Sequence, residues 1–156
     1  MKRDPRLRPL SWDHHHALAL ARRATLAATD QNPGTLEDTW DEVVQRFDDE
    51  LVPHFEIEER FLLPAMSAVG EGPLVERVLD DHLVIRDLVQ RATVDLRKRS
   101  AEFGARLTEH VRFEERVLFP VAESKLTDEE LEAIAMATPV PRTRMTPREE
   151  KQEDER

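Results

Sequence analysis

HFEIEERFLLP at residues 54–64 and HVRFEERVLFP at residues 110–120 are two copies of one pattern. Each copy begins with a histidine, continues with a Glu-Glu-Arg triplet after three intervening residues, and ends in proline. The polar surface positions differ between the copies, whereas the histidine, the carboxylates and their spacing are retained. Such a repeat indicates a functional site rather than a scaffold. We interpret each copy as part of a metal centre.

Length and composition limit what can hold such a centre. The chain has 156 residues, enough for one domain with a sizeable core, and it has no cysteine. Disulfides, thiolate metal sites and a cysteine nucleophile are therefore excluded, and any metal must be bound through nitrogen and oxygen. The net charge of −10, with Lys and Arg interleaved among Asp and Glu, argues against a nucleic-acid partner.

The chain also lacks the signals of membrane insertion. Its basic start, MKRDPRLRPL, is followed by SWDHHH rather than by an apolar segment, and no run of 18 apolar residues occurs. We expect neither a signal peptide nor a transmembrane span, no membrane partner, and a cytoplasmic location.

Apolar periodicity predicts helix after helix. The first should begin near Leu10 or Ser11 and stop before the turn at 30–34, and the second should run from about Thr35 to Ala68. Their inward-facing positions, spaced by three or four residues, are Leu10, His14, Ala17, Ala21, Ala24 and Ala28 in the first, and Trp40, Val44, Phe47, Leu51, His54, Glu58, Phe61 and Ala65 in the second.

A third helix is expected from Pro73 to about Lys98 and a fourth from about Ser100 to Ser124. The inward positions are Val75, Val78, Leu79, His82, Ile85, Val89, Ala92 and Leu96 in the third, and Phe103, Leu107, His110, Glu114, Val117 and Val121 in the fourth. The inward positions of the second and fourth helices superpose, so their His and Glu are both predicted to be buried. Pro53, Pro64 and Pro120 fall inside helices, where proline kinks the backbone.

Short connections make successive helices antiparallel neighbours, so the predicted fold is an all-α, up-down-up-down four-helix bundle. Thr127 and Glu130 form a capping-box pattern that starts a short C-terminal helix across one end of the bundle. We assign the bundle domain to residues 1–138 and expect the charged, proline-containing tail at 139–156 to be disordered.

The bundle would bring together one histidine per helix and two glutamates: His14, His54, Glu58, His82, His110 and Glu114. His14 is favoured on the first helix because matching Asp13-His14 with Asp81-His82 aligns the following apolar residues. His15 remains the alternative, and His16 is expected at the surface.

Imidazole and carboxylate ligands suit iron, manganese or zinc, and two carboxylates that can each bridge argue for two ions. Two divalent ions would also compensate the buried carboxylates, which otherwise need a partner such as Arg60 or Arg116.

The order His, His-x-x-x-Glu, His, His-x-x-x-Glu on four successive helices, over roughly residues 10–124, resembles the hemerythrin-like family, also called the HHE cation-binding domain. The resemblance implies a four-helix bundle around two non-haem iron ions with bridging carboxylates and an oxo or hydroxo group. It also implies that His14, His54, Glu58, His82 and His110 are metal ligands, together with a carboxylate of the fourth helix.

The chain departs from the oxygen-carrying members of that family in two places. Their further histidine, four residues before the third-helix ligand, corresponds here to Val78. Their last carboxylate corresponds to Glu115, whereas the internal repeat favours Glu114. We expect the first glutamate of each doublet to face inward and the second, Glu59 or Glu115, to face out.

The resulting functional hypothesis is a non-haem di-iron protein that binds or senses O2, NO or peroxide, or that responds to iron itself. A di-iron oxidase or peroxidase is the alternative enzyme, although the ligand set has more histidine than the carboxylate-rich di-iron bundles and the chain has no tyrosine. A third hypothesis is a zinc-stabilised interaction module.

Overall fold

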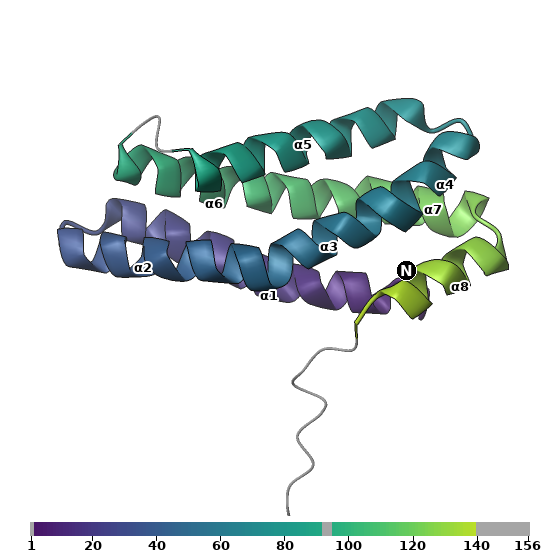
Figure 1. The fold of residues 1–156 in the computed structure, drawn as a ribbon, viewed down its shortest axis with the longest axis horizontal. Helices are drawn as coiled ribbons and strands as arrows, with labels where there is room; N and C mark the ends of the chain where they lie inside the picture. The colour runs from purple at the N-terminus through teal and green to yellow at the C-terminus, as the bar shows by residue number, and fades with distance from the viewer. Residues whose placement is uncertain (1, 92–94, 140–156) are drawn as a thin grey trace, which may run out of the picture.

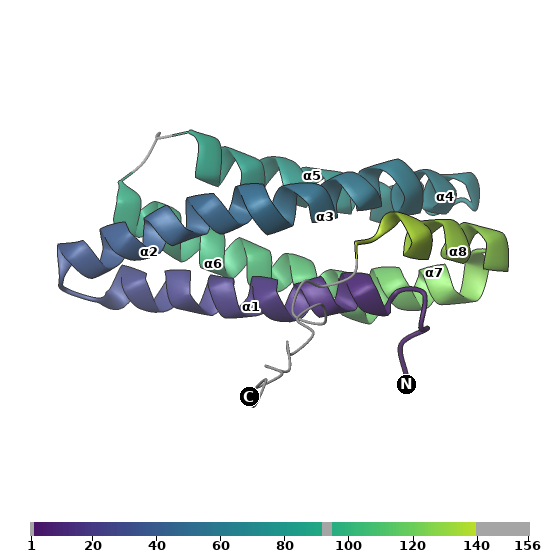
Figure 2. The ribbon, with the colours of Figure 1, turned by 60° about the horizontal axis from the view of Figure 1, so that its bottom comes forward.

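The computed structural model describes residues 2–91 and 95–139. Every regular element in these two ranges is helical, and four long helical stretches follow one another in antiparallel order, as the sequence predicts (Figures 1 and 2). The first stretch is α1 (Arg8–Thr29) and the third is α5 (Gly72–Gln90). The second and fourth are composite, because short π-helical turns interrupt them.

The second stretch consists of α2 (Pro33–Arg46), the π turn η1 (Phe47–Leu51), α3 (Val52–Ile57), the π turn η2 (Glu58–Leu62) and α4 (Leu63–Ala68). The fourth consists of α6 (Leu96–Phe113), the π turn η3 (Glu114–Leu118) and α7 (Phe119–Lys125). The repeated sequence motif is thus also a repeated structure: η2 and η3 both start at the first glutamate of the doublet.

The π turns explain how proline is accommodated inside the two composite stretches. Pro53, Pro64 and Pro120 each lie two residues after the end of a π turn. Proline has no N–H and its ring clashes with the carbonyl four residues earlier in a regular α-helix, at a cost of roughly 3 kcal/mol. In all three cases that carbonyl belongs to the wider π turn. The local distortion expected at the prolines is therefore present, as π turns beside the predicted site.

The same π turns correct the predicted inward positions beyond each glutamate. A π turn contains one more residue than an α-helical turn, so the buried positions after Glu58 are Leu62 and Met66, while Phe61 is 40 % exposed. After Glu114 the buried positions are Leu118 and Ala122 rather than Val117 and Val121. The prediction assumed an uninterrupted α-helical period and was wrong by one residue in both copies.

Three helix boundaries also differ from the prediction. The second stretch starts at Pro33, because the Asn32 side chain accepts a hydrogen bond from the Gly34 N–H and caps the helix. The third helix ends at Gln90 instead of Lys98, and α6 starts at Leu96, where the Asp95 side chain accepts from the Lys98 N–H. The predicted inward position Ala92 and the predicted tail from 140 onward lie outside the described residues.

Small side chains let α1 and α6 pack closely. The buried alanines predicted on α1 face α6, and Ser100 donates a hydrogen bond of 2.7 Å to the Ala24 carbonyl. A Cβ placed on Gly104 would lie 2.7 Å from the Ala21 carbonyl oxygen and 2.1 Å from Thr25 Oγ1. A glycine is therefore required at this crossing.

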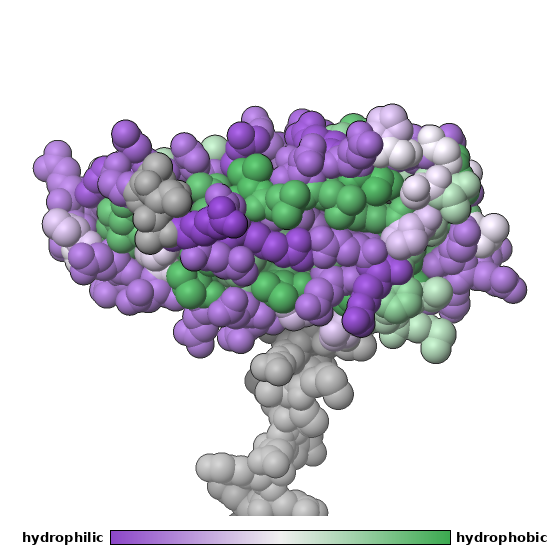
Figure 3. Space-filling view, turned by 45° about the horizontal axis from the view of Figure 1, so that its top comes forward, coloured by the Kyte–Doolittle hydropathy of each residue, from purple (hydrophilic) through white to green (hydrophobic). Residues whose placement is uncertain are grey.

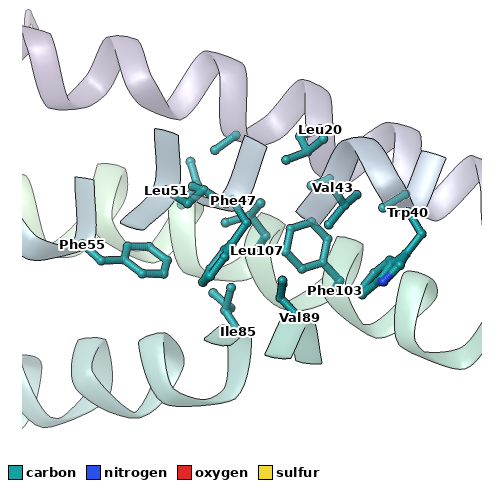
Figure 4. Close-up of a cluster of buried hydrophobic side chains, with 14 residues drawn as sticks. Leu20, Trp40, Val43, Phe47, Leu51, Phe55, Ile85, Val89, Phe103 and Leu107 are labelled. Atoms are coloured by element: carbon teal, nitrogen blue, oxygen red, sulfur yellow. The ribbon is translucent and has the colours of Figure 1, made fainter. Parts of the chain in front are cut away.

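The core is divided into two hydrophobic clusters. One occupies the half of the bundle that contains α2 and includes Leu20, Trp40, Phe47, Phe55, Ile85, Phe103 and Leu107 (Figure 4). The other occupies the opposite half and includes Leu7, Leu10, Leu62, Met66, Val78, Leu118, Phe119 and Ile134. Along α1, His14 lies between Leu10 of one cluster and Ala17 of the other, so the predicted site separates the two clusters.

The last helix, α8 (Asp128–Ala137), packs against the half of the bundle that contains the second cluster (Figures 1 and 2). It runs lengthwise along the flank of the bundle and contacts η2, instead of lying across one end as expected. Its capping box is formed as predicted, with Thr127 and Glu130 exchanging side-chain and backbone hydrogen bonds. The face of the molecule drawn in Figure 3 is mainly hydrophilic, with hydrophobic stripes between the polar side chains. Leu79, predicted to face inward, is 37 % exposed. None of the described helices has the length and apolar character needed to cross a membrane.

Candidate metal centre

The structure brings together six buried side chains from all four helical stretches. They form two groups that share both glutamates: His14, His54, Glu58 and Glu114 in one, and His82, His110, Glu58 and Glu114 in the other. Within each group the potential ligand atoms lie within 4.8 Å of one another. We call His14 with His54 the first half-site and His82 with His110 the second half-site.

Each glutamate presents one oxygen to each half-site. Glu58 Oε1 lies 2.8 Å from His54 Nε2, and Glu58 Oε2 lies 3.1 Å from His82 Nε2. Glu114 Oε2 lies 2.9 Å from His14 Nε2, and Glu114 Oε1 lies 3.1 Å from His110 Nε2. The imidazole centroids are 5.0 Å apart in the first half-site and 4.9 Å apart in the second. The half-sites are therefore near-equivalent, and both carboxylates are placed to bridge them.

Hydrogen bonding does not satisfy the atoms that face one another in this centre. All four histidine Nε2 atoms and all four oxygens of Glu58 and Glu114 are buried, yet none makes a hydrogen bond of acceptable geometry. Buried polar atoms without a partner are costly, and buried carboxylates especially so. Eight such atoms converging on two shared positions fit a pair of metal ions, because each ion would receive two imidazole nitrogens and two carboxylate oxygens.

Electrostatic coupling between the histidines and glutamates is strong. Burial lowers the pKa of His110, but the Glu114 and Asp81 carboxylates outweigh it and raise the pKa to about 10. The pKa of His54 is likewise raised, against the effect of burial, by Glu58 and Asp13. Burial raises the pKa of the Glu114 carboxyl, yet His110 and His14 hold it well below its ordinary value. Protons and divalent cations therefore compete for the same nitrogen and oxygen atoms.

A second layer of carboxylates contacts the outer nitrogen, Nδ1, of every histidine. Asp13 Oδ2 lies 2.9 Å from His54 Nδ1, and Asp81 Oδ2 lies 3.3 Å from His110 Nδ1. Glu115 Oε1 lies 2.8 Å from His14 Nδ1, and Glu59 Oε1 lies 3.4 Å from His82 Nδ1. Each contact joins two different helical stretches, so the four contacts form a closed ring around the bundle.

This ring orients the imidazoles. A carboxylate at Nδ1 favours the tautomer that carries its proton there, which leaves Nε2 free to bind a metal. The ring also corrects the expectation that Glu59 and Glu115 face out. Both are partly buried, and each contacts a histidine of a neighbouring helix. They face sideways because η2 and η3 widen the helix at the Glu-Glu doublet.

In each half-site a phenylalanine ring covers one of the two histidines. The Phe55 ring is stacked on His82 at a centroid distance of 3.8 Å, and the Phe119 ring is stacked on His14 at 5.3 Å. The two are not equivalent in the repeat, since residue 55 corresponds to Val111 and residue 119 to Leu63. The repeat therefore accounts for the ligand positions, but not for the walls around them.

The alternatives left open by the sequence occupy distinct places. His14 lies in the first half-site, whereas His15 is exposed and His16 is half-buried, both beside Trp12. Val78, at the position of the additional family histidine, is fully buried in the second hydrophobic cluster. The contacts of Glu58 and Glu114 are with histidines and not with the neighbouring Arg60 or Arg116.

Asp13 and Asp81 are the site residues that the sequence interpretation missed. Each directly precedes a histidine of the site, in the pairs Asp13-His14 and Asp81-His82. This shared Asp-His pair could have identified the aspartates, but it was taken only as an alignment of the two histidines. The partner of each aspartate is a histidine on the following helical stretch, which spacing within one helix does not reveal.

Comparison with known protein families supports the interpretation drawn from the repeat. The family model described as "Hemerythrin HHE cation binding domain" matches residues 10–122. This range contains all six residues of the two groups. It also contains all four outer carboxylates, Asp13, Glu59, Asp81 and Glu115. Searches of curated proteins and of solved structures give no significant match.

Proposed function

The chain belongs to the hemerythrin HHE cation-binding family, and from that premise we propose that it is a non-haem di-iron protein that binds or senses O2 or a related small ligand such as NO or peroxide. One observation carries the proposal. Two buried histidine pairs share two glutamates that each direct one oxygen to either pair. This donor set can hold two ions side by side.

In this proposal the ligands of the two ions are His14, His54, His82, His110, Glu58 and Glu114. Nitrogen and oxygen donors in these proportions suit iron, and cysteine is absent from the sequence. With two histidines and two shared carboxylates each, neither half-site supplies six protein ligands. Coordination positions are therefore left for a bridging oxo or hydroxo group and for an exogenous ligand.

Two iron ions, when bound, would supply the electrons and the vacant coordination positions that binding of O2 or NO requires. The protein's own residues determine which ligands reach them. Phe55 and Phe119 place apolar rings against His82 and His14, and the hydrophobic clusters lie on both sides of the centre. A small, weakly polar ligand suits these surroundings better than a large or charged substrate.

The ionisation of the outer glutamates also favours binding over turnover. Asp13, Asp81 and Glu115 pair with Nδ1 of His54, His110 and His14, and Glu59 Oε1 lies 3.4 Å from Nδ1 of His82. The pKa values of Glu59 and Glu115 are lowered to about 2, so these two carboxylates are anionic near neutral pH. For Glu59 the main cause is the hydrogen bond from Arg86, and for Glu115 the contacts with His14, Ser11 and Arg3 outweigh the opposing effect of burial. Neither Glu59 nor Glu115 is therefore poised to donate a proton to a reduced oxygen ligand near neutral pH.

The test is to express the protein with iron and to measure metal content, absorption and response to gases. We expect about two irons per chain, near-ultraviolet charge-transfer bands, and a spectral change that reverses on cycling between argon and air. Sustained consumption of peroxide would favour the oxidase or peroxidase alternative instead. A colourless protein that takes up zinc and cannot be reconstituted with iron would contradict the proposal and favour the zinc-stabilised module.

A further inference from the structure

The N-terminal segment, residues 2–7, precedes α1 (Figure 2) and contacts an outer carboxylate of the first half-site. Arg3 Nη2 donates hydrogen bonds of 2.8 Å to Glu115 Oε2 and to the Glu115 carbonyl oxygen, and Nη1 donates one of 2.7 Å to Glu123 Oε1. Glu115 is the carboxylate whose other oxygen contacts His14 Nδ1. The Glu115 side chain therefore connects Arg3 to His14.

Arg3 also contacts the wall of the first half-site. Its guanidinium lies 5.3 Å from the centroid of the Phe119 ring, and the same ring is stacked on the His14 imidazole. The two groups that restrain His14 from outside, a carboxylate and a phenyl ring, thus both contact the same arginine.

The second half-site has an equivalent arginine, but this arginine belongs to a helix of the bundle. Arg86 donates two hydrogen bonds of 2.8 Å to the Glu59 carboxylate and lies 5.4 Å from the centroid of Phe55, the ring stacked on His82. It lies on α5, one turn after His82, so the helix itself determines its position.

Arg3, in contrast, is held only by contacts of a non-helical segment. The Asp4 N–H donates to Glu123 Oε1 at 3.0 Å, Arg6 pairs with Asp128 of α8 at 2.9 Å, and Leu7 is buried in the second hydrophobic cluster. The Arg3 and Arg6 pairs are partly exposed to solvent, and pairs of this kind contribute at most about 1 kcal/mol each and weaken with salt. Leu7, next to α1, is thus firmly buried, whereas residues 3–6 are held by few and individually weak contacts.

We propose that the N-terminal segment is a latch for the first half-site, with Arg3 as a positioning residue for His14. With the segment docked, Arg3 fixes Glu115 and Phe119, and these orient the His14 imidazole. With the segment released, the first half-site binds its metal ion more weakly, while the second retains its affinity because Arg86 stays on α5. The latch rests on the proposed metal site, but not on the identity of the gas ligand.

The experiment measures anaerobic ferrous iron binding, by chelator competition, in two backgrounds that each retain one intact histidine pair. His110→Ala keeps the first half-site, and His54→Ala keeps the second. Adding Arg3→Ala should weaken binding about 10–100-fold in the His110→Ala background and leave it unchanged in the His54→Ala background, as expected for loss of an outer-sphere restraint. Arg86→Ala is the matched control and should show the reverse pattern. Arg3→Lys should restore part of the affinity, because it keeps one donor and the charge.

The outcomes separate this proposal from the proposed function. If the wild-type chain binds no ferrous iron, both are overturned. If it binds two ions and Arg3→Ala weakens the two backgrounds equally, or neither, the latch alone is overturned, since a merely structural role for Arg3 would not distinguish the half-sites. If a background variant does not fold, Arg3→Ala in the otherwise unchanged chain tests the latch instead. It should weaken the binding of one of the two iron ions, and equal affinity for both ions would contradict the latch.

Discussion

The two half-sites of this centre share two glutamates and the same pairing of imidazoles, but they differ in what surrounds them. In the first half-site the outer carboxylates lie 2.8 and 2.9 Å from Nδ1, and in the second they lie 3.4 and 3.3 Å away. The first nevertheless depends on an arginine from the N-terminal segment, whereas the arginine of the second lies on α5. The internal repeat thus explains the symmetric inner ligands, and residues outside the repeat make the halves unequal.

The largest effect should come from removing a ligand that both halves share. Glu114→Ala deletes one oxygen from each half-site and leaves Nε2 of His14 and of His110 without the carboxylate oxygen that faces it. Loss of an outer carboxylate weakens metal binding about 10–100-fold, and we expect a larger loss of affinity here, for both ions. The thermal midpoint should fall as well, because metal binding and folding are linked. Iron content and thermal unfolding would be measured together. Retention of two ions would contradict the bridging role.

Removing a histidine, which belongs to one half-site only, should abolish iron binding at that half-site alone. His54→Ala removes one imidazole from the first half-site, and His110→Ala removes one from the second. In each variant the other half-site keeps both histidines and both glutamates, so we expect bound iron to fall from about two ions to about one, since ligand number sets affinity. Elemental analysis after dialysis would measure this. Complete loss of iron in both variants would mean that the halves bind only cooperatively.

The outer aspartates should show a smaller and unequal effect. Asp13→Asn and Asp81→Asn keep the size of the side chain but remove the charge that faces His54 and His110. We expect each to weaken one ion by about 10-fold or more. Asp13 should have the larger effect, because its contact is 2.9 Å long and that of Asp81 is 3.3 Å. An equal effect of the two substitutions would show that the difference in contact length has no energetic consequence.

A change of pH should act on the metal-free and iron-loaded proteins in opposite directions. The pKa of His110 is raised from 6.5 to about 10, so its contribution to stability is fully present below pH 6.5 and is lost as the pH rises toward 10. Iron binding instead requires deprotonated Nε2 atoms and strengthens as the pH rises.

The difference in thermal midpoint between iron-loaded and chelator-treated protein should therefore widen from about pH 6 to about pH 9. Scanning calorimetry at a series of pH values would measure it. A difference that stays constant or narrows would argue against competition between protons and metal at the histidines.

Much of the fold and the inner part of the site could be predicted from the sequence, because both depend on local periodicity. The apolar pattern with a period of 3.6 residues identified the four stretches, and the repeat placed His54 and Glu58 in the same relation as His110 and Glu114. The capping box at Thr127 was also readable, since its partners lie three residues apart. In each case the interacting residues belong to one helix.

The errors arose where the period changed or the partner was remote. The π turns at Glu58 and Glu114 each add a residue to a turn, so Phe61 and Val117 were placed inside although Leu62 and Leu118 are buried there. The outer carboxylates contact histidines on other stretches, and Arg3 contacts Glu115 across 112 positions of the chain. Such pairs depend on how the helices are rotated against one another, which a periodic pattern does not specify.

The central claim is that two metal ions lie side by side, each between one histidine pair and both glutamates. Anomalous diffraction at the iron edge from crystals of the iron-loaded protein tests it most directly. We predict two peaks about 3.5–4 Å apart, one beside His14 and His54 and the other beside His82 and His110, with Glu58 and Glu114 between them. A single peak, or iron bound away from these residues, would contradict the account.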